Sequence, residues 1–297
     1  MILVWGLLQD ATTRSVCDCL ARLSARVAFV NHADIARTKV RFTSDGADSY
    51  RLTCRDLSYE LAEMSAAYLR PYDHRDYGDY VKPGDEAPMV GSAELVHHLI
   101  GAWAESTAAL VINRPSAEAS NHSKLVQATH ILASGFSVPA SLVTNEPDRV
   151  REFQARHSRI IYKSMSSVRS IVQELDASAL DALGPMGPVM FQQRVMGTNF
   201  RVHVIGGETV ACVIHSDGVD YRYAPSSIAP FALPNDVAAR CVALSEQLGL
   251  VLAGIDLVRT SLDEWYCLEV NPNPAFSCYE LSDDKIIARA VADALID

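Results

Sequence analysis

A short stretch near the end of the sequence combines an acid, an amide and two prolines. In CLEVNPNPAF, Glu269 and Asn271 are two positions apart, and Pro272 and Pro274 follow them. Successive side chains of a strand alternate between its faces, so residues two apart project from the same side, about 7 Å from each other. We therefore expect Glu269 and Asn271 to point into one site, with the prolines fixing how the chain leaves it.

The residues before this stretch extend the strand and suggest a partner for it. Alternation predicts that Trp265 and Cys267 share the face of Glu269. Asp256 lies in an earlier apolar segment, and antiparallel pairing of the two segments would bring it to the same space. Two carboxylates and a carboxamide supply the hard oxygen ligands that Mg²⁺ prefers. The alternative is that Glu269 is an exposed strand residue before an ordinary turn.

Basic side chains occur where phosphate ligands would be useful. Lys124 lies at the start of a predicted helix, and Lys163 ends the apolar strand RIIYK. In a later strand, Asn199, Arg201 and His203 alternate onto one face, and a buried arginine rarely lacks an anionic partner. Lys163 could instead be a solvated lysine at the end of a strand, and a core or surface role is open for His203.

The first third of the chain is predicted to form a small α/β domain. Strand patterns over 1–8 and 26–31 enclose a helical pattern over 15–23. The region 40–90 is polar and rich in turn signals, so we expect loops there. A helix follows, in which Leu95, Leu99 and Trp103 share a face.

The remaining two thirds alternate helices with closely spaced strands. Asn121 or Ser123 can cap a helix that Gly135 ends, with Leu125 and Leu132 on its apolar face. A second helix begins at Pro147. Further strands are predicted over 136–145, 159–163, 189–195, 199–207, 208–216, 220–224, 254–260 and 264–271, and helices over 236–249 and 283–296.

Composition narrows the classes of function. The net charge of −10 and the isoelectric point near 5.4 argue against a nucleic-acid partner. No uncharged apolar run reaches about 18 residues, so we expect no membrane span. The seven cysteines show no zinc or disulfide spacing, and the first residues read as a strand and not as a signal peptide. We expect a cytoplasmic protein, and a homo-oligomer stays open.

The order of these motifs resembles that of the ATP-grasp superfamily. Within it the chain looks most similar to RimK-type amino-acid ligases and to the macrocyclases of microviridin-like graspetides. The similarity covers roughly residues 110–297, with a looser likeness before them. The matching positions are Lys124, Lys163, the hinge FQQRV, the triplet Asn199-Phe200-Arg201, Asp256, Glu269 and Asn271.

This resemblance implies an α/β and α+β chain with the ATP-grasp fold. It implies an N-terminal pre-ATP-grasp domain over 1–114, a central subdomain over 115–188 and a C-terminal subdomain with the metal site over 189–297. ATP would lie between the last two. One or two Mg²⁺ ions would accompany it, and the second substrate would be an amino acid or a peptide.

The resemblance also implies a role for each residue. Lys124 and Lys163 would contact phosphates, with Asn199 in the same site, while Arg201 would stabilise the transferring phosphoryl group. Backbone groups of Arg194 and Val195, assisted by Gln193, would contact adenine. Asp256, Glu269 and Asn271 would hold the metal. Apart from the resemblance, a guanidinium suits bidentate recognition of a carboxylate, so Arg222 of DYRY is expected to bind the substrate carboxylate, with an exposed surface tract as the alternative.

Three departures from the family pattern are visible. No glycine-rich loop follows Lys163, where the chain has SMSSVRS. Gln193 and Asn199 stand where acidic residues are common. The graspetide pattern NPxGQ is also missing, because Pro274, Ala275 and Phe276 occupy its place.

The function that follows is an ATP-dependent carboxylate–amine ligase. A substrate carboxylate would attack the γ-phosphate to give an acylphosphate, and an amine would then displace phosphate. The alternatives are a graspetide-type macrocyclase, a kinase that releases its phosphorylated product, and an ATP-binding module without chemistry.

Overall fold

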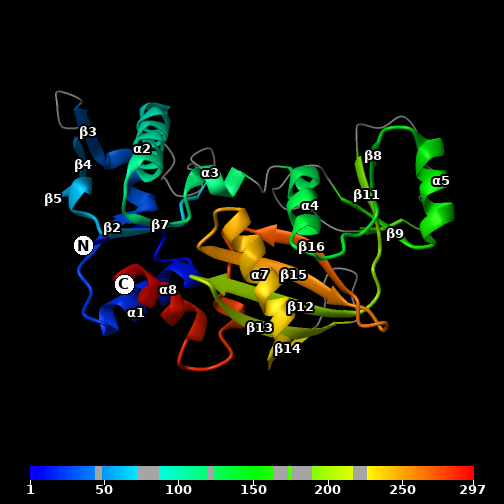
Figure 1. The fold of residues 1–297 in the computed structure, drawn as a ribbon. Coiled ribbons are helices and arrows are strands. Elements are labelled where there is room, and N and C mark those ends of the chain that lie inside the picture. The colour runs from blue at the N-terminus through cyan, green and yellow to red at the C-terminus, as the bar shows by residue number, and fades with distance from the viewer. Residues whose placement is uncertain (44–48, 73–86, 120–122, 164–172, 176–188, 217–225) are drawn as a thin grey trace.

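The protein is described from a computed structural model. The structure describes residues 1–297 except 44–48, 73–86, 120–122, 164–172, 176–188 and 217–225. Four sheets organise the described residues, two in the N-terminal third, one central and one C-terminal (Figure 1).

The N-terminal third is built on a parallel sheet with the strand order β2-β1-β6-β7. Its strands are β1 (Ile2–Gly6), β2 (Val27–Asn31), β6 (Ala66–Leu69) and β7 (Leu110–Ile112), and its helices are α1 (Ala11–Arg22) and α2 (Ala87–Ser106). Every residue of β1 is buried, as expected of a central strand covered on both sides. Asp10 begins α1 by accepting a hydrogen bond from the backbone N–H of Thr13.

The predicted loop region 40–90 contains more structure than expected. β3 (Lys39–Thr43), β4 (Ser49–Cys54) and β5 (Leu57–Glu60) form an antiparallel sheet, flanked by short helices η1 (His32–Arg37) and η2 (Leu61–Glu63). The prediction was wrong because these strands are short and carry exposed polar residues, which resemble turn sequence. The loop signals over 73–86 lie outside the described residues.

The predicted apolar face of α2 was also displaced. Trp103 is buried, but Leu95 is 54% exposed, and the buried residues are instead Ala93, Val96, Ile100 and Ala104. These positions follow the same helical period with a different starting residue, so the helix was recognised while its face was misplaced.

The central segment forms a small antiparallel sheet with the order β10-β9-β11-β8. Its elements are α3 (Pro115–Glu118), α4 (Lys124–Ala133), β8 (Ser141–Thr144), α5 (Pro147–His157), β9 (Ile160–Lys163), β10 (Gln173–Glu174) and β11 (Val189–Gln193). Ser123 caps α4, and Pro147 begins α5. β11 pairs with β8 and β9, so this sheet extends past the predicted boundary at 188/189; the division into three parts stays a prediction.

The C-terminal segment forms a five-stranded antiparallel sheet with the order β14-β13-β12-β15-β16. Its elements are β12 (Thr198–Ile205), β13 (Glu208–Ser216), β14 (Ser226–Phe231), α7 (Asn235–Gln247), β15 (Leu252–Arg259), β16 (Trp265–Asn271), η6 (Ser277–Tyr279) and α8 (Ile286–Ile296). In Figure 1, α4 lies over β16, and α8 lies beside α1. One apolar core includes residues of α1, the parallel sheet, β12, β13 and α8, which joins the N-terminal and C-terminal segments.

Candidate active site

Three neighbouring strands bring Arg201, Asp256 and Glu269 into one row. In the register of the sheet, Arg201 of β12 lies opposite Asp256 of β15, and Asp256 lies opposite Glu269 of β16. The Arg201 Nη1 donates to Asp256 Oδ1 at 2.8 Å, and both side chains are largely buried. The expected antiparallel pairing of the two acidic segments is therefore present, and the buried arginine has its anionic partner.

The alternation predicted for β16 fails at one residue. Trp265 and Cys267 pack in the same core cluster as Val270, on the side away from Glu269. The register shifts here, because Asp256 pairs with Glu269 whereas the next residue of β15 pairs with Cys267. Leu268 is thus the extra residue of a β-bulge, which turns the strand and aims Glu269 at the site.

A glycine makes room for the arginine in this row. Gly254 lies on β15 opposite Asn271, two residues before Asp256. A Cβ built on Gly254 would lie 2.6 Å from Arg201 Cζ and 2.7 Å from Pro274 Cβ. A larger residue would displace the guanidinium, so Gly254 is a residue of the site that sequence reasoning missed; its signal was its position two residues before Asp256.

Helix α4 is fixed to β16 by a glutamine and places its lysine over the row. Gln127 Nε2 donates to the Val270 carbonyl at 2.8 Å, and Gln127 Oε1 accepts from the Val270 N–H at 2.9 Å. One turn earlier, Lys124 Nζ lies 3.6 Å from Glu269 Oε2. The lysine side chain is 15% exposed, so its charge faces the carboxylate in a restricted space.

The turn after Asn271 is held by side chains from distant parts of the sequence. Asn113 Nδ2 donates to the carbonyl oxygens of Leu252 at 2.7 Å and Pro272 at 2.5 Å. Its Oδ1 accepts from the N–H groups of Val251 at 2.9 Å and Leu252 at 3.1 Å. Asn113 is buried, so it ties the end of β7 to the beginning of β15 and to this turn.

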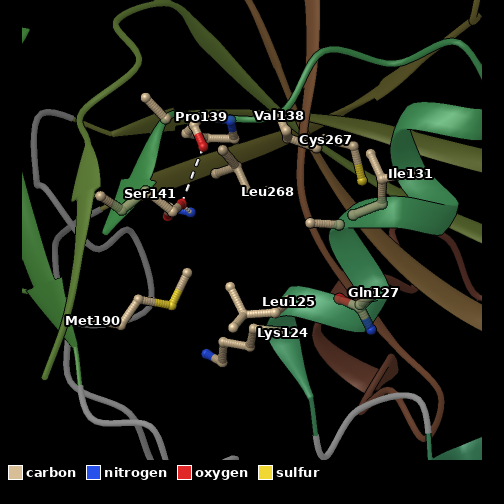
Figure 2. A pocket seen from close by; sticks show the side chains of 13 residues that line it. Lys124, Leu125, Gln127, Ile131, Val138, Pro139, Ser141, Met190, Cys267 and Leu268 are labelled. Carbon is tan, nitrogen blue, oxygen red and sulfur yellow. Dashed lines mark hydrogen bonds between the residues drawn. The ribbon is translucent and has the colours of Figure 1, made fainter. Parts of the chain in front are cut away.

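A cavity of about 210 Å³ lies between α4, the small sheet and β16. Lys124 and Leu125 reach it from α4, Met190 from β11 and Leu268 from β16 (Figure 2). Leu125 was expected on the buried face of α4, but it is 51% exposed because it lines this open space. Leu132, expected on the same face, is also exposed, and the buried residues of α4 are Gln127 and Ile131.

A second cavity, of about 280 Å³, adjoins the first and shares Gln192 and Leu268 with it. It is lined by the predicted adenine contacts and by Asn199, and the set includes Ile161, Gln193, Arg194, Val195, Met196 and Val258. The backbone N–H of Arg194 donates to the Arg159 carbonyl at 3.0 Å, and the Arg194 side chain pairs with Glu174. The first cavity is mainly apolar with Lys124 in its lining, whereas the second also has several polar lining residues, among them Gln193 and Asn199.

Comparisons with known proteins identify this arrangement. No protein-family model and no curated protein sequence matches the chain. Solved structures do. The macrocyclase MdnC from Microcystis aeruginosa, bound with its precursor peptide MdnA, has a TM-score of 0.84 at 21% identity, covering 100% of this chain and 99% of MdnC. The ATP-grasp ligase PsnB, complexed with a phosphomimetic variant of a minimal precursor, Mg and ADP, has a TM-score of 0.83 at 26% identity, covering 99% and 97%.

The chain has the fold of the ATP-grasp ligases. A more distant likeness, to D-alanine–D-alanine ligase from Bacillus anthracis, has a TM-score of 0.61 at 14% identity and covers 99% of this chain and 95% of that one. The ATP-grasp fold runs through the whole chain, which confirms the predicted fold class. The predicted enzyme class is confirmed too: the chain is an ATP-dependent ligase.

The predicted metal ligands of this ATP-grasp ligase have a donor set that fits Mg²⁺. Asp256, Glu269 and Asn271 offer two carboxylates and a carboxamide on adjacent strands. Asn271 Oδ1 accepts the Asn273 N–H at 2.9 Å, and an amide oxygen has a second lone pair for a cation. Within the described ranges, no group of three His, Cys, Asp or Glu side chains could hold a metal, so the carboxamide is needed to complete the set.

His203 occupies the core beside the ATP-grasp site. It lies on β12 opposite Gly254, it is fully buried, and its ring contacts Phe276 and Tyr279. Burial, together with the nearby charge of Arg201, holds the pKa of the imidazole well below its ordinary value. His203 is therefore a neutral core residue near neutral pH, the role that sequence reasoning left open.

Several expectations for this ATP-grasp chain lie outside the described residues. These are Arg222 with DYRY, and the segment SMSSVRS after Lys163. The backbone of Lys163 ends β9 and pairs with Met190, but its side chain is also outside the description. All seven cysteines are free, as expected, and four are buried. No described helix is long and apolar enough to cross a membrane.

Proposed function

We propose that this ATP-grasp ligase joins a carboxyl side chain to an amine within a peptide, using ATP and Mg²⁺. The single observation that carries the proposal is the row Arg201, Asp256 and Glu269 in register across three strands, with Lys124 3.6 Å from Glu269. MdnC and PsnB, which were each solved with a precursor peptide, support a peptide as the second substrate. The NPxGQ pattern of graspetide ligases, which this chain lacks, includes none of Arg201, Asp256 and Glu269.

Each residue of the row has a task in this reaction. Asp256, Glu269 and Asn271 would hold Mg²⁺, which neutralises phosphate charge and orients the nucleotide. Lys124, and Lys163 at the end of β9, would add positive charge at the phosphates. Arg201, fixed by Asp256, would stabilise the negative charge of the transferring phosphoryl group.

The reaction balances without a protein nucleophile. The peptide carboxylate attacks the γ-phosphorus, the bond to the β-phosphate oxygen breaks, and ADP leaves. The amine then attacks the acyl carbon, gives up a proton, and phosphate leaves with the electron pair of the broken bond. The peptide loses one water for each bond that forms. Gln193, Arg194, Val195 and Asn199, which line the second cavity, would surround the nucleotide during both steps.

Arg222 is proposed to hold the substrate carboxylate, because a guanidinium binds it through two parallel hydrogen bonds. Truncation to Ala should raise KM for the peptide more than KM for ATP, and Lys should restore little. A loss of ATP affinity with unchanged peptide KM would assign Arg222 to the nucleotide site.

The proposal is tested by combining ADP release with mass spectrometry. The chain is incubated with ATP, Mg²⁺ and candidate peptides that contain both acidic and lysine residues, and first of all with any peptide encoded beside its gene. The expected result is ADP formation only with a true peptide substrate, which loses water without fragmenting. Turnover with free amino acids and none with peptides would favour an amino-acid ligase instead. ADP formation with a stable phosphorylated product would favour a kinase.

A further inference from the structure

A guanidinium from the N-terminal segment lies against the turn that follows the predicted metal ligands. Arg70 comes directly after β6. Its Nη1 donates to the backbone carbonyls of Asn273 at 3.1 Å and Pro274 at 3.2 Å, and it also contacts Asn273 Oδ1. Arg70 and Asn273 are more than two hundred positions apart in the sequence, so their contact is a tertiary link between the parallel sheet and the candidate site.

Arg70 is itself held in place by an acid. Its Nε donates to Asp10 Oδ2 at 2.8 Å, and both side chains are 12% exposed. The same carboxylate accepts the N–H and the hydroxyl of Thr13, each at 2.8 Å. Burial raises the pKa of Asp10, but the charge of Arg70 and the bonds from Thr13 outweigh it and hold this pKa below its ordinary value. The guanidinium is therefore anchored to the start of α1 by an ionised partner.

The turn connects Arg70 to the side chain of Asn271 through Asn273. The Asn273 N–H donates to Asn271 Oδ1 at 2.9 Å. Because Pro272 and Pro274 have no N–H, Asn273 supplies the only backbone donor of the three residues after Asn271. The Asn273 N–H belongs to the same planar peptide unit as the Pro272 carbonyl, which accepts from Asn113. Arg70 binds the carbonyl of Asn273 itself and the Asn273 side chain. Asn273 is therefore held on both sides of its Cα, and a movement of this residue would break the bond to Asn271.

We propose that Arg70 is a positioning residue for the metal site, acting on the Asn271 carboxamide through Asn273. It restricts the movement of Asn273, whose N–H occupies one lone pair of the Asn271 oxygen and would leave the other available to a cation. This inference rests on the proposed function, since it takes Asn271 as a metal ligand. Side chains that orient metal ligands typically change metal affinity by about 10–100-fold when they are removed.

The test measures Mn²⁺ binding, which does not depend on turnover. Free Mn²⁺ is followed by electron paramagnetic resonance in the presence of ADP, and ADP binding without metal is measured by calorimetry. We expect Arg70→Ala to weaken Mn²⁺ binding about 10-fold and to leave metal-free ADP binding within about twofold of wild type. A matched control is Arg55→Ala, which removes another arginine of the N-terminal segment that is paired to an aspartate at 2.8 Å. It should leave both affinities unchanged.

A second variant approaches the same link from the other side. Asn273→Ala removes the side-chain oxygen that Arg70 contacts but keeps the N–H that Asn271 needs. We expect a loss of Mn²⁺ affinity of about threefold, and a double variant no weaker than Arg70→Ala alone, because both changes break one link. This variant also decides the question if Arg70→Ala does not fold.

The outcomes separate this inference from the proposed function. Mn²⁺ affinity within twofold of wild type in the folded Arg70 variant, or equal losses in the Arg55 control, would overturn the positioning role alone. So would an unchanged Mn²⁺ affinity in Asn273→Ala if that is the variant that folds. If wild type itself binds no Mn²⁺ with ADP, the proposed metal site fails and the inference fails with it.

Discussion

The ligands of the proposed metal site are held in two different ways. Asp256 and Glu269 are held by the backbone ladder of an antiparallel sheet, in which each faces a partner across the strands. Asn271 is the last residue of β16, and the turn after it is held by side chains of Asn113 and Arg70. The ladder is a local consequence of strand pairing, whereas the turn depends on contacts across the whole chain. The two regions should therefore respond differently to mutation.

The largest expected loss of turnover comes from a mutation in the strand ladder that holds Asp256 and Glu269. Glu269→Gln keeps the shape of the side chain but removes its charge, so Mg²⁺ and Lys124 lose a partner. We expect ATP-dependent turnover to fall by about 10²-fold or more, on the scale of losing one strong electrostatic contact to the transition state. The measurement is ADP release under saturating ATP, with thermal melting as the check on folding. Turnover near the wild-type rate would mean that Glu269 is an ordinary strand residue.

A smaller loss should follow from filling the space beside Arg201. Gly254→Ala places a methyl group against Arg201 and Pro274, so the guanidinium has to move. We expect turnover to fall about 10-fold or more, with a loss of about 1–3 kcal/mol in stability from overpacking. Gly91→Ala is a suitable control for stability, since its Cβ would meet nothing within 4 Å. An active, stable Gly254→Ala would show that the row tolerates displacement of Arg201.

A mutation that releases the turn after Asn271 should first lower the free energy of unfolding. Asn113→Ala removes the partners of two backbone N–H groups and two carbonyls at once. Buried groups that lose their partners cost about 1–3 kcal/mol each, but water and relaxation recover part, so we expect a loss of about 2–4 kcal/mol. Urea unfolding measures it, with the exposed Asn235→Ala as the control. An effect below 1 kcal/mol would show that the turn does not depend on Asn113.

The smallest expected effect depends on pH. Burial raises the pKa of Glu118 to about 7, and Arg70 offsets part of the shift. A pKa raised in the folded state favours the protonated form there. The contribution of Glu118 to the free energy of unfolding is therefore greatest below its unfolded-state pKa near 4.5, and it is lost as the pH rises to about 7. Glu118→Gln should match wild type at pH 4.5 and be more stable at pH 8, by less than about 3 kcal/mol. Melting curves of wild type and Glu118→Gln are compared at both pH values. A difference in stability between the two proteins that is the same at pH 4.5 and pH 8 would contradict this prediction.

The contrast also explains what the sequence could predict. The strands and the antiparallel pairing of the segments that carry Asp256 and Glu269 follow from alternation and spacing, which are local signals. The position of Arg201 opposite Asp256 was not predicted. The bulge at Leu268 was invisible, because an apolar residue there fits both an ideal strand and a bulged one. Gln127, Asn113 and Arg70 were missed because each binds a site residue that lies at least 138 positions away in the sequence. No local pattern distinguishes such residues from ordinary polar ones.

The most direct test of the central claim follows oxygen from the peptide to phosphate. The carboxyl groups of a peptide substrate are labelled with oxygen-18, and the phosphate released during ligation is analysed by mass spectrometry. An acylphosphate route requires one carboxylate oxygen to leave with the phosphoryl group, so the account predicts one labelled oxygen in each phosphate, together with ADP. Unlabelled phosphate, or the release of AMP and pyrophosphate, would contradict it.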